Sequence, residues 1–201
     1  MSERAWAAAG KFLVAIIVLV AIVIAAEVII VIQHGVSART PPTASEEMLA
    51  TTVRHLAIPA FARKTRNPLP VTAASLAEAR DHFADHCASC HGNDGSGKTE
   101  VGENLYPHAP DMREERTQKL TDGEIFYIIR NGVRMTGMPA WGDQHDAADN
   151  WKLVHFIRHL PKITPAEIEE MKRMNPTSPH ERREQKEEEE FLKGDQKNAT
   201  H

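Results

Sequence analysis

Apolar and polar residues are distributed very unevenly along this chain. The stretch from Phe12 to Ile32 is apolar at every position except Glu27. A helix of this length rises roughly 30 Å, which is the thickness of the hydrocarbon layer of a bilayer. A core helix of a soluble protein would normally show a polar face, and this stretch has none. We therefore predict that residues 1–34 form an N-terminal membrane anchor, with residues 12–32 in the lipid bilayer.

The same stretch can also be interpreted as a signal peptide. Val36-Ser37-Ala38 has the small residues of a cleavage site, so cleavage after Ala38 remains an alternative. The apolar stretch is longer than the core of a cleaved signal, which favours the anchor. Arg4 and Lys11 precede it and, by the positive-inside rule, stay in the cytoplasm. The sequence thus predicts a single-pass membrane protein whose remaining residues lie on the periplasmic, extracytoplasmic side.

Helical periodicity dominates residues 71–175. Apolar residues recur at helical spacing in three stretches, 72–90, 122–131 and 149–160, and no strand pattern of any length occurs between them. The apolar positions are Leu76, Ala79, Phe83 and Cys87, then Ile125, Ile128 and Ile129, then Leu153, Phe156, Ile157 and Leu160. A further helix is expected to open at Thr164, which is followed by proline and then by glutamate at the third helical position. The predicted fold class is all-α.

Two segments flank this domain. Residues 35–70 have the composition of a linker, with five prolines, although Ser45 to Arg54 could form a short helix that Ser45 caps. The prolines are Pro41, Pro42, Pro59, Pro68 and Pro70. Residues 176–201 are dominated by charge, including the run from Glu187 to Glu190. We interpret them as a charged, disordered tail, because such a segment cannot bury enough apolar surface to order itself.

Composition narrows the possible functions. The chain has 201 residues, a net charge of −4 and no basic block, which argues against binding nucleic acid through a basic face. Two cysteines exclude a disulfide-rich scaffold. Six Phe, three Trp and two Tyr are few large rings for a core. Because a domain of about 90 residues is small for a self-sufficient core, we expect a large apolar group to complete it.

Both cysteines lie in one C-x-x-C-H motif, Cys87 to His91, which is typical of covalent haem attachment. Residues three apart near the end of a helix share a face, so both sulfurs can reach the two vinyl groups of one haem. His91 then offers its imidazole to the iron as the proximal ligand. A zinc site would need further cysteines, and a thioredoxin-like motif would need a βαβ context. The sequence predicts one covalent haem c bound to Cys87 and Cys90.

A second axial ligand is expected downstream. Met138 stands between a glycine, which permits close approach of the backbone, and a proline, which stiffens the loop. Met135 is its rival, and His108 or His145 could replace methionine. Arg134 and Trp141 carry donors suited to the haem propionates. Solvation of Arg134 and packing of Trp141 are the simpler alternatives.

Several stretches together resemble the class I, single-haem cytochromes c, in particular their small bacterial branch. They are Cys87 to Gly92, Asp94 to Gly97, Pro110 to Met112 and Asn131 to Trp141. The resemblance covers roughly residues 72–160. It implies an all-α fold whose N- and C-terminal helices cross beside the haem, and it implies Met138 as the sixth ligand. It also implies that the Pro110 carbonyl accepts the ring N–H of His91, with Pro107 as the alternative.

These features predict an electron carrier rather than an enzyme. A haem iron with two protein ligands has no open site for a substrate, so it is suited to outer-sphere electron transfer. The expected partners are membrane redox complexes or other electron donors and acceptors. Two alternatives remain open at this point. The chain could be an electron-relay subunit of a larger membrane oxidoreductase, or a haem-based sensor, although no output module is evident.

Overall fold

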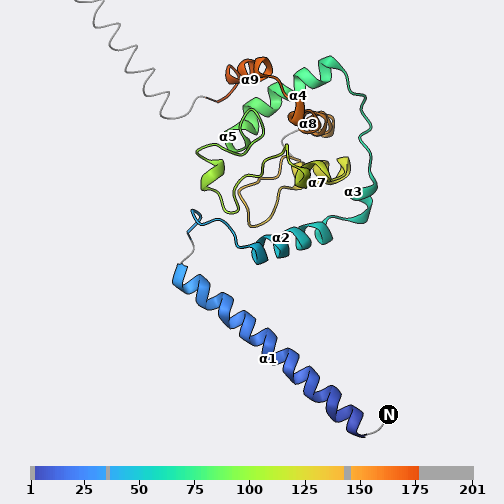
Figure 1. Cartoon of the computed structure of the whole chain (residues 1–201). Coiled ribbons are helices and arrows are strands. Elements are labelled where there is room, and N and C mark those ends of the chain that lie inside the picture. Colours follow the sequence, from blue (N-terminus) through green and yellow to red (C-terminus); the bar gives the residue numbers. More distant parts are fainter. Residues whose placement is uncertain (1–2, 35–36, 143–145, 177–201) are drawn as a thin grey trace, which may run out of the picture. The chain divides into compact units, whose positions relative to one another are not determined.

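The computed structural model describes residues 3–34, 37–142 and 146–176. The chain divides into two compact units, Met1–Thr40 and Pro41–His201. Within the described residues every regular element is a helix (Figure 1). The all-α fold class predicted from the sequence is therefore confirmed. Of the predicted tail, residues 177–201 lie outside the described part of the chain.

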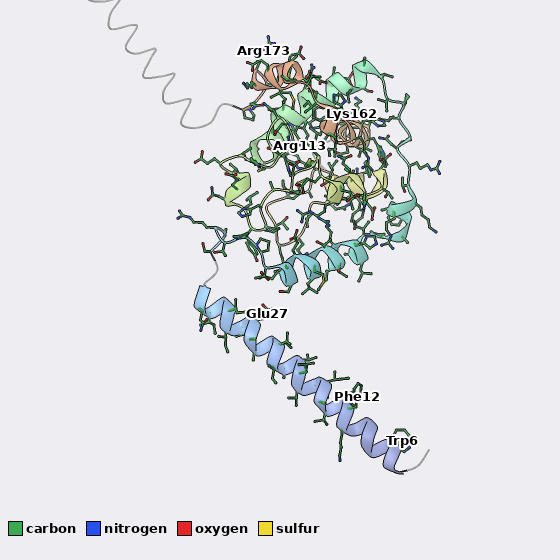
Figure 2. All side chains as sticks on the ribbon, viewed as in Figure 1. Trp6, Phe12, Glu27, Arg113, Lys162 and Arg173 are labelled. Carbon is green, nitrogen blue, oxygen red and sulfur yellow. The ribbon has the colours of Figure 1, made fainter. Side chains whose placement is uncertain are left out.

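The first unit is built on one long helix, α1 (Glu3–His34). Its segment Gly10–Ile30 has a mean hydropathy of 3.3, none of it is buried, and it is long and apolar enough to cross a membrane. Figure 2 shows Phe12 and Glu27 at well-separated points along this helix. Continuous exposure of leucine, isoleucine and valine to water is unfavourable. The helix therefore fits the membrane anchor that the sequence predicts.

Two helices form the core of the second unit. Helix α4 (Ala73–His86) packs along α8 (Ala147–His159), and the rings of Phe83 and Phe156 meet there with centroids 5.1 Å apart. Both phenylalanines are fully buried. Trp151 of α8 stacks on Phe126, with ring centroids 3.9 Å apart. This crossing pair corresponds to the two helices expected from stretches 72–90 and 149–160.

Helices α7 (Asp122–Asn131) and α9 (Pro165–Lys172) complete the core, and both begin at capping boxes. The side chain of Thr121 accepts from the backbone N–H of Glu124, whose carboxylate accepts in return, and Thr164 and Glu167 repeat this arrangement. Gly132 ends α7 with a positive φ. Shorter helices fill the connections: α5 (Ala88–His91), α6 (Glu115–Gln118) and two 3₁₀ turns, η1 (Gly102–Asn104) and η2 (Leu160–Lys162).

The segment interpreted from its prolines as a linker is largely helical. Helix α2 (Ala44–Ala57) begins at Thr43, whose capping box with Glu46 replaces the predicted cap at Ser45. Helix α3 (Ala60–Lys64) begins at Pro59, so this proline starts a helix where the composition suggested a coil. Residues from Pro41 onward belong to the second unit. Residues 44–57 and 60–64 of the predicted linker are thus helical.

Helix α3 packs closely on the beginning of α7. A Cβ atom added at Gly123 would lie 1.9 Å from the carbonyl oxygen of Ala62, a distance that no side chain could occupy. Glycine at this position therefore sets the approach of the two helices. Helix α3 thus belongs to the same compact unit as the cysteine motif.

Candidate functional site

The cysteine motif lies where α4 passes into α5. Cys87 is the C-cap residue that follows α4, and its carbonyl oxygen accepts from the backbone N–H of Cys90 at 3.2 Å and of His91 at 2.9 Å. This single tight turn places the two cysteines on one side of the chain, as their spacing predicts. Both are free thiols and partly buried. The motif is therefore presented by rigid helical backbone rather than by a loop.

A cavity of about 390 Å³ opens beside this motif, and its walls are mainly apolar. Its lining residues come mainly from the motif, from α7 and α8, and from two loops, 105–112 and 133–141. The apolar lining includes Leu105, Pro107, Met112, Leu120, Ile125, Ile128, Ile129, Val133, Leu153 and Ile157. The cavity thus combines an apolar lining with two adjacent cysteines, as a covalently bound apolar ring would need.

The imidazole of His91 is held uncharged by its surroundings. Only 8% of the residue is exposed, and this burial lowers the pKa of His91 to about 4. The Pro110 carbonyl raises this pKa, because it can accept a hydrogen bond from the imidazole ring. That contact falls short of full hydrogen-bond geometry, and His91 Nδ1 has no other partner in the described part of the chain. A neutral imidazole is the form that binds a metal.

Burial acts in the same way on the first cysteine. It raises the pKa of the Cys87 thiol to about 12, with a smaller contribution from Cys90. The thiol is therefore protonated at neutral pH and has none of the thiolate character of a redox C-x-x-C pair. In the described residues no group of three or more His, Cys, Asp and Glu side chains could hold a metal ion. Both alternatives considered for the motif, redox dithiol and zinc site, lack support in these surroundings.

The loop that carries Pro110 is fastened to the segment after the motif. The backbone N–H of Gly97 donates to the His91 carbonyl at 2.8 Å, and that of Met112 donates to Gly95 at 2.8 Å. A Cβ atom at Gly97 would lie 2.2 Å from the carbonyl oxygen of Ala109, and the φ of Gly97 is +73°. Only glycine allows both this conformation and this approach. The pairing brings Pro110 to the side of His91, which is the arrangement implied by the family resemblance.

Arg113, which is labelled in Figure 2, joins the same two loops through charge. Its guanidinium donates to Asp111 through Nε at 2.9 Å and Nη2 at 2.6 Å, and to Asp94 through Nη1 at 3.1 Å. The hydrogen bond from Arg113 holds the pKa of the Asp111 carboxyl below its usual range. The residue beside Pro110 is thus tied to the glycine-rich loop that follows His91.

The two candidate methionines are placed differently. The loop 133–138 is closed by a hydrogen bond from the Val133 N–H to the Met138 carbonyl at 3.1 Å. The Thr136 hydroxyl also donates to the Val133 carbonyl and accepts from the Met138 N–H. Met135 lies at its tip with a φ of +61° and is 91% exposed. Met138 is partly buried and lines the cavity. Of the two thioethers, only that of Met138 is brought to the cavity that His91 lines.

The remaining predicted residues are distributed as follows. Trp141 lines the cavity and stacks on His86, with ring centroids 5.4 Å apart. His108 also lines the cavity, and its buried Nδ1 has no hydrogen-bond partner in the described part of the chain. Arg134 is exposed and is not among the lining residues. His145 lies outside the described residues.

Arg54 is a charged lining residue that sequence reasoning did not single out. Arg54, on α2, contributes to the cavity wall although it precedes the cysteine motif by more than 30 positions. Nothing in its own sequence neighbourhood points to the cavity, because its position depends on how α2 folds back on the domain. The one available signal was the capping pattern of Thr43 and Glu46, which could have identified α2 as a real helix.

Residues 74–157 match the family described as cytochrome c oxidase, cbb3-type, subunit III. The match includes the whole cysteine motif and the loop that carries Met138. The chain contains a class I c-type cytochrome domain. This cytochrome domain occupies the part of the second unit that begins with α4 and ends within α8. The family match confirms the resemblance to class I cytochromes c that the sequence motifs indicated.

Among solved structures, a chain of the reducing HAO-like protein complex of Kuenenia stuttgartiensis resembles this chain. The two are 17% identical, with a TM-score of 0.42. The match covers 48% of this chain and 49% of that chain, so it spans about half of either one.

Cytochromes c carry haem, and the residues of this cytochrome domain fit that group. The cavity is apolar, two free thiols stand at its wall, and a buried neutral imidazole and a partly buried thioether line it. The polar groups that remain along the cavity include Arg54 and Trp141, which are donors suited to carboxylates. The second unit thus provides a place for the apolar ring as well as donors for the acidic edge of a haem.

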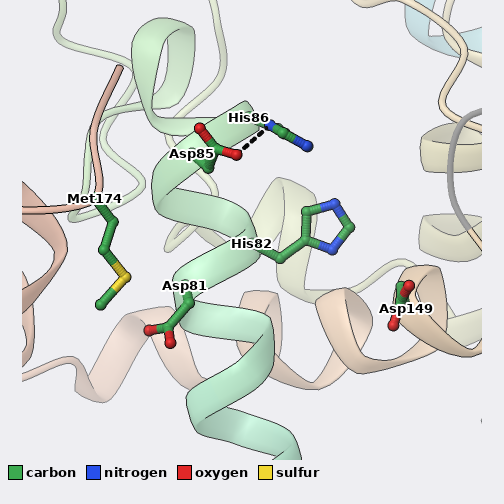
Figure 3. A pocket seen from close by; sticks show the side chains of 6 residues that line it. All are labelled: Asp81, His82, Asp85, His86, Asp149 and Met174. Atoms are coloured by element: carbon green, nitrogen blue, oxygen red, sulfur yellow. Dashed lines mark ion pairs between the residues drawn. The ribbon is translucent and has the colours of Figure 1, made fainter. Parts of the chain in front are cut away.

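A second hollow lies outside this cavity. It measures about 550 Å³ and runs along α4 of the cytochrome domain, where acidic and histidine side chains alternate (Figure 3). Asp85 and His86 form an ion pair there at 3.1 Å, and His82 meets His86 edge to face. This hollow is an open, polar surface, in contrast to the apolar cavity. Among the described residues, His86 lines both this hollow and the apolar cavity.

Proposed function

We propose that the protein is a membrane-tethered, single-haem cytochrome c that passes electrons between redox partners outside the cytoplasm. One observation supports this more than any other: Cys87, Cys90, His91 and Met138 all line the same apolar cavity. Bound there, haem would supply one-electron exchange between Fe(III) and Fe(II). The residues around it need only hold it, exclude water and leave an edge accessible to a partner.

Each residue has a defined role in this proposal. Cys87 and Cys90 attach the haem through thioether bonds, His91 is the proximal ligand and Met138 the distal ligand. Pro110 orients His91 by accepting its ring N–H. Thioether is a soft, neutral ligand that favours Fe(II), so methionine ligation gives a higher reduction potential than ligation by two histidines.

Trp141 and Arg134 were predicted as donors to the propionates. The position of Trp141 at the cavity wall supports this role for its indole N–H. The exposed position of Arg134 lends it no such support.

The anchor determines where electron transfer takes place. Helix α1 is long and apolar enough to span the bilayer, and Lys11 lies at the N-terminal end of its apolar stretch. Basic residues on that side favour a cytoplasmic N-terminus and a periplasmic haem domain. Tethering to the membrane raises the effective concentration of the domain near membrane-bound partners. We therefore propose membrane redox complexes as its electron donors and acceptors.

A second candidate function is an electron-relay subunit of a membrane oxidoreductase. The description of the matching family, a subunit of an oxidase, favours it. Both candidates use the same haem and the same ligands, and they differ in whether the chain stays bound to a catalytic partner. A free carrier purifies alone from detergent-solubilised membranes. A relay subunit purifies with other chains in fixed proportion.

The proposed function is tested on the full-length protein expressed with c-type haem maturation. Covalent haem remains with the chain on a denaturing gel and stains there, and Cys87→Ala combined with Cys90→Ala abolishes the stain. The wild-type protein should accept and release one electron per chain in a redox titration. If acid–acetone extraction of the native protein removes the haem, covalent attachment is wrong.

A further inference from the structure

Arg54 stands out among the residues that line the cavity. It is the one lysine or arginine among the described residues that line the cavity. It also comes from α2, which lies outside the part of the chain that matches the cytochrome family. An ionised side chain at the wall of an apolar cavity is costly unless an anion accompanies it. The position therefore requires an explanation in terms of a negatively charged partner.

The protein itself supplies only part of the negative charge that would accompany Arg54. Burial lowers the pKa of the Arg54 guanidinium, and the charge of Glu124 acts against this effect. Within the described residues, the guanidinium makes no hydrogen bond or ion pair that meets ordinary distance limits. The Glu124 carboxylate is itself buried, and its Oε2 is engaged in the capping box of α7. Its Oε1 makes no hydrogen bond in the same part of the chain and lies 3.3 Å from His55 Nδ1. Most of the five N–H donors of Arg54 thus remain free for another acceptor.

Several contacts hold α2 in place over the cavity. Glu47, near its beginning, pairs with Arg116 of α6. At its other end, His55 approaches Glu124 of α7, and the His55 carbonyl accepts from Arg63 Nη1 at 2.8 Å. The helix therefore contacts the cytochrome domain near both of its ends. The position of Arg54 between them follows from this attachment.

We propose that the Arg54 guanidinium binds a haem propionate, so that α2 is a working part of the cofactor site. This rests on the proposed function, because it requires haem in the cavity. A planar guanidinium can offer two parallel N–H donors to a carboxylate, a geometry that lysine lacks. The propionate supplies the anion that the cavity wall lacks, and Glu124 contributes the remaining negative charge. Arg54 is thus a positioning residue that also adjusts the reduction potential.

The expected effect has a definite sign. A positive charge beside the haem destabilises the Fe(III) form, which carries one more positive charge than the Fe(II) form. Replacing Arg54 by glutamine therefore shifts the midpoint potential to lower values. Arg54→Lys keeps the charge but loses the paired donors. It should leave the potential close to that of the wild type and still change the propionate bending modes in the resonance Raman spectrum.

The experiment compares the full-length holoprotein with Arg54→Gln, Arg54→Lys and a matched control. Arg66→Gln is that control, because Arg66 is an exposed arginine of the same segment and does not line the cavity. Each variant is first checked for haem stain on a denaturing gel. Loss of the stain in the wild type itself would refute the proposed function rather than this proposal. Where haem is present, potential and Raman modes are measured at neutral pH.

The proposal is supported if Arg54→Gln lowers the potential and alters the propionate modes while Arg66→Gln changes neither. It is overturned if Arg54→Gln changes neither, or if Arg66→Gln gives an equal shift. It is likewise overturned if Arg134→Gln alone produces the effect, since the propionate partner would then be the arginine expected from the sequence. Should Arg54→Gln fail to accumulate, Arg54→Lys decides through the Raman modes alone.

Discussion

The imidazole of His86 stacks on the indole of Trp141, with ring centroids 5.4 Å apart and 5° between the ring planes. The contact joins the last turn of α4 to the loop that carries Met138. His86 immediately precedes the first cysteine of the motif, and both stacked residues line the cavity. The two sides of the cavity that would provide the axial ligands are thus connected through one pair of rings.

Replacement of Trp141 should separate packing from propionate binding. Trp141→Phe keeps an aromatic ring against His86 and should cost less than about 1 kcal/mol of unfolding free energy. Trp141→Ala removes the ring and should cost about 2–3 kcal/mol, less than for a fully buried tryptophan. Urea unfolding of the holoproteins measures both. If the indole N–H also donates a hydrogen bond to a haem propionate, Trp141→Phe removes that hydrogen bond and changes the Raman propionate modes. Unchanged modes would assign Trp141 to packing alone.

The distal ligand is tested by a pair of methionine variants. Met138→Ala should abolish the weak near-infrared band of sulfur-to-iron ligation in the Fe(III) protein and open the iron to CO or imidazole. Met135→Ala should leave the band unchanged, because the Met135 side chain is 91% exposed at the tip of the turn. The opposite result would identify Met135 as the ligand. If neither variant changes the spectrum, His108 becomes the candidate, and the expected high potential is wrong.

The state of the N-terminus decides between anchor and signal peptide. We expect protein isolated from membranes to retain α1 and to require detergent for extraction. Intact mass and N-terminal sequencing of that protein provide the measurement. A mature chain that begins at Arg39 would show that the apolar helix is removed after Ala38.

The Arg113–Asp111 contact predicts a pH dependence of stability. The pKa of Asp111 is lowered in the folded protein, chiefly by its hydrogen bond with Arg113, so ionised Asp111 favours folding. This contribution is fully present above the unfolded pKa of about 4 and is lost as the pH falls through the lower folded value. Since Arg113 is partly solvated, Arg113→Gln should cost only about 0.5–1 kcal/mol at pH 7. The difference from the wild type should shrink in urea unfolding below about pH 4. A difference that stays constant to acid pH would contradict the assignment to Asp111.

Sequence predicted most reliably what is encoded locally. The helix that begins at Thr164 was predicted from cap residues whose hydrogen bonds form within one turn. The cysteine motif likewise carries its geometry in its own spacing. The prolines of residues 35–70 indicated only a linker composition, whereas Pro59 occupies the cap position before a helix, where its missing N–H costs nothing.

Contacts between distant segments could not be predicted in the same way. Spacing alone left Met135 and Met138 as rivals, and the positive φ of Met135, which turns one away, is a property of the folded loop. Arg54 reaches the cavity because α2 contacts the cytochrome domain through Glu47 and His55. No periodicity in one sequence encodes such a pairing, since it depends on complementary surfaces far apart in the chain.

The tight contact between Gly123 and Ala62 also defines how the protein can be divided. A fragment that begins where the family match begins, at residue 74, lacks α3 and exposes the first turn of α7 to water. A fragment of residues 41–176 keeps both sides of that contact and all residues around the cavity. Crystallisation, partner-binding assays and transfer of this haem module onto other anchors should therefore start from Pro41, well upstream of the recognisable cytochrome sequence.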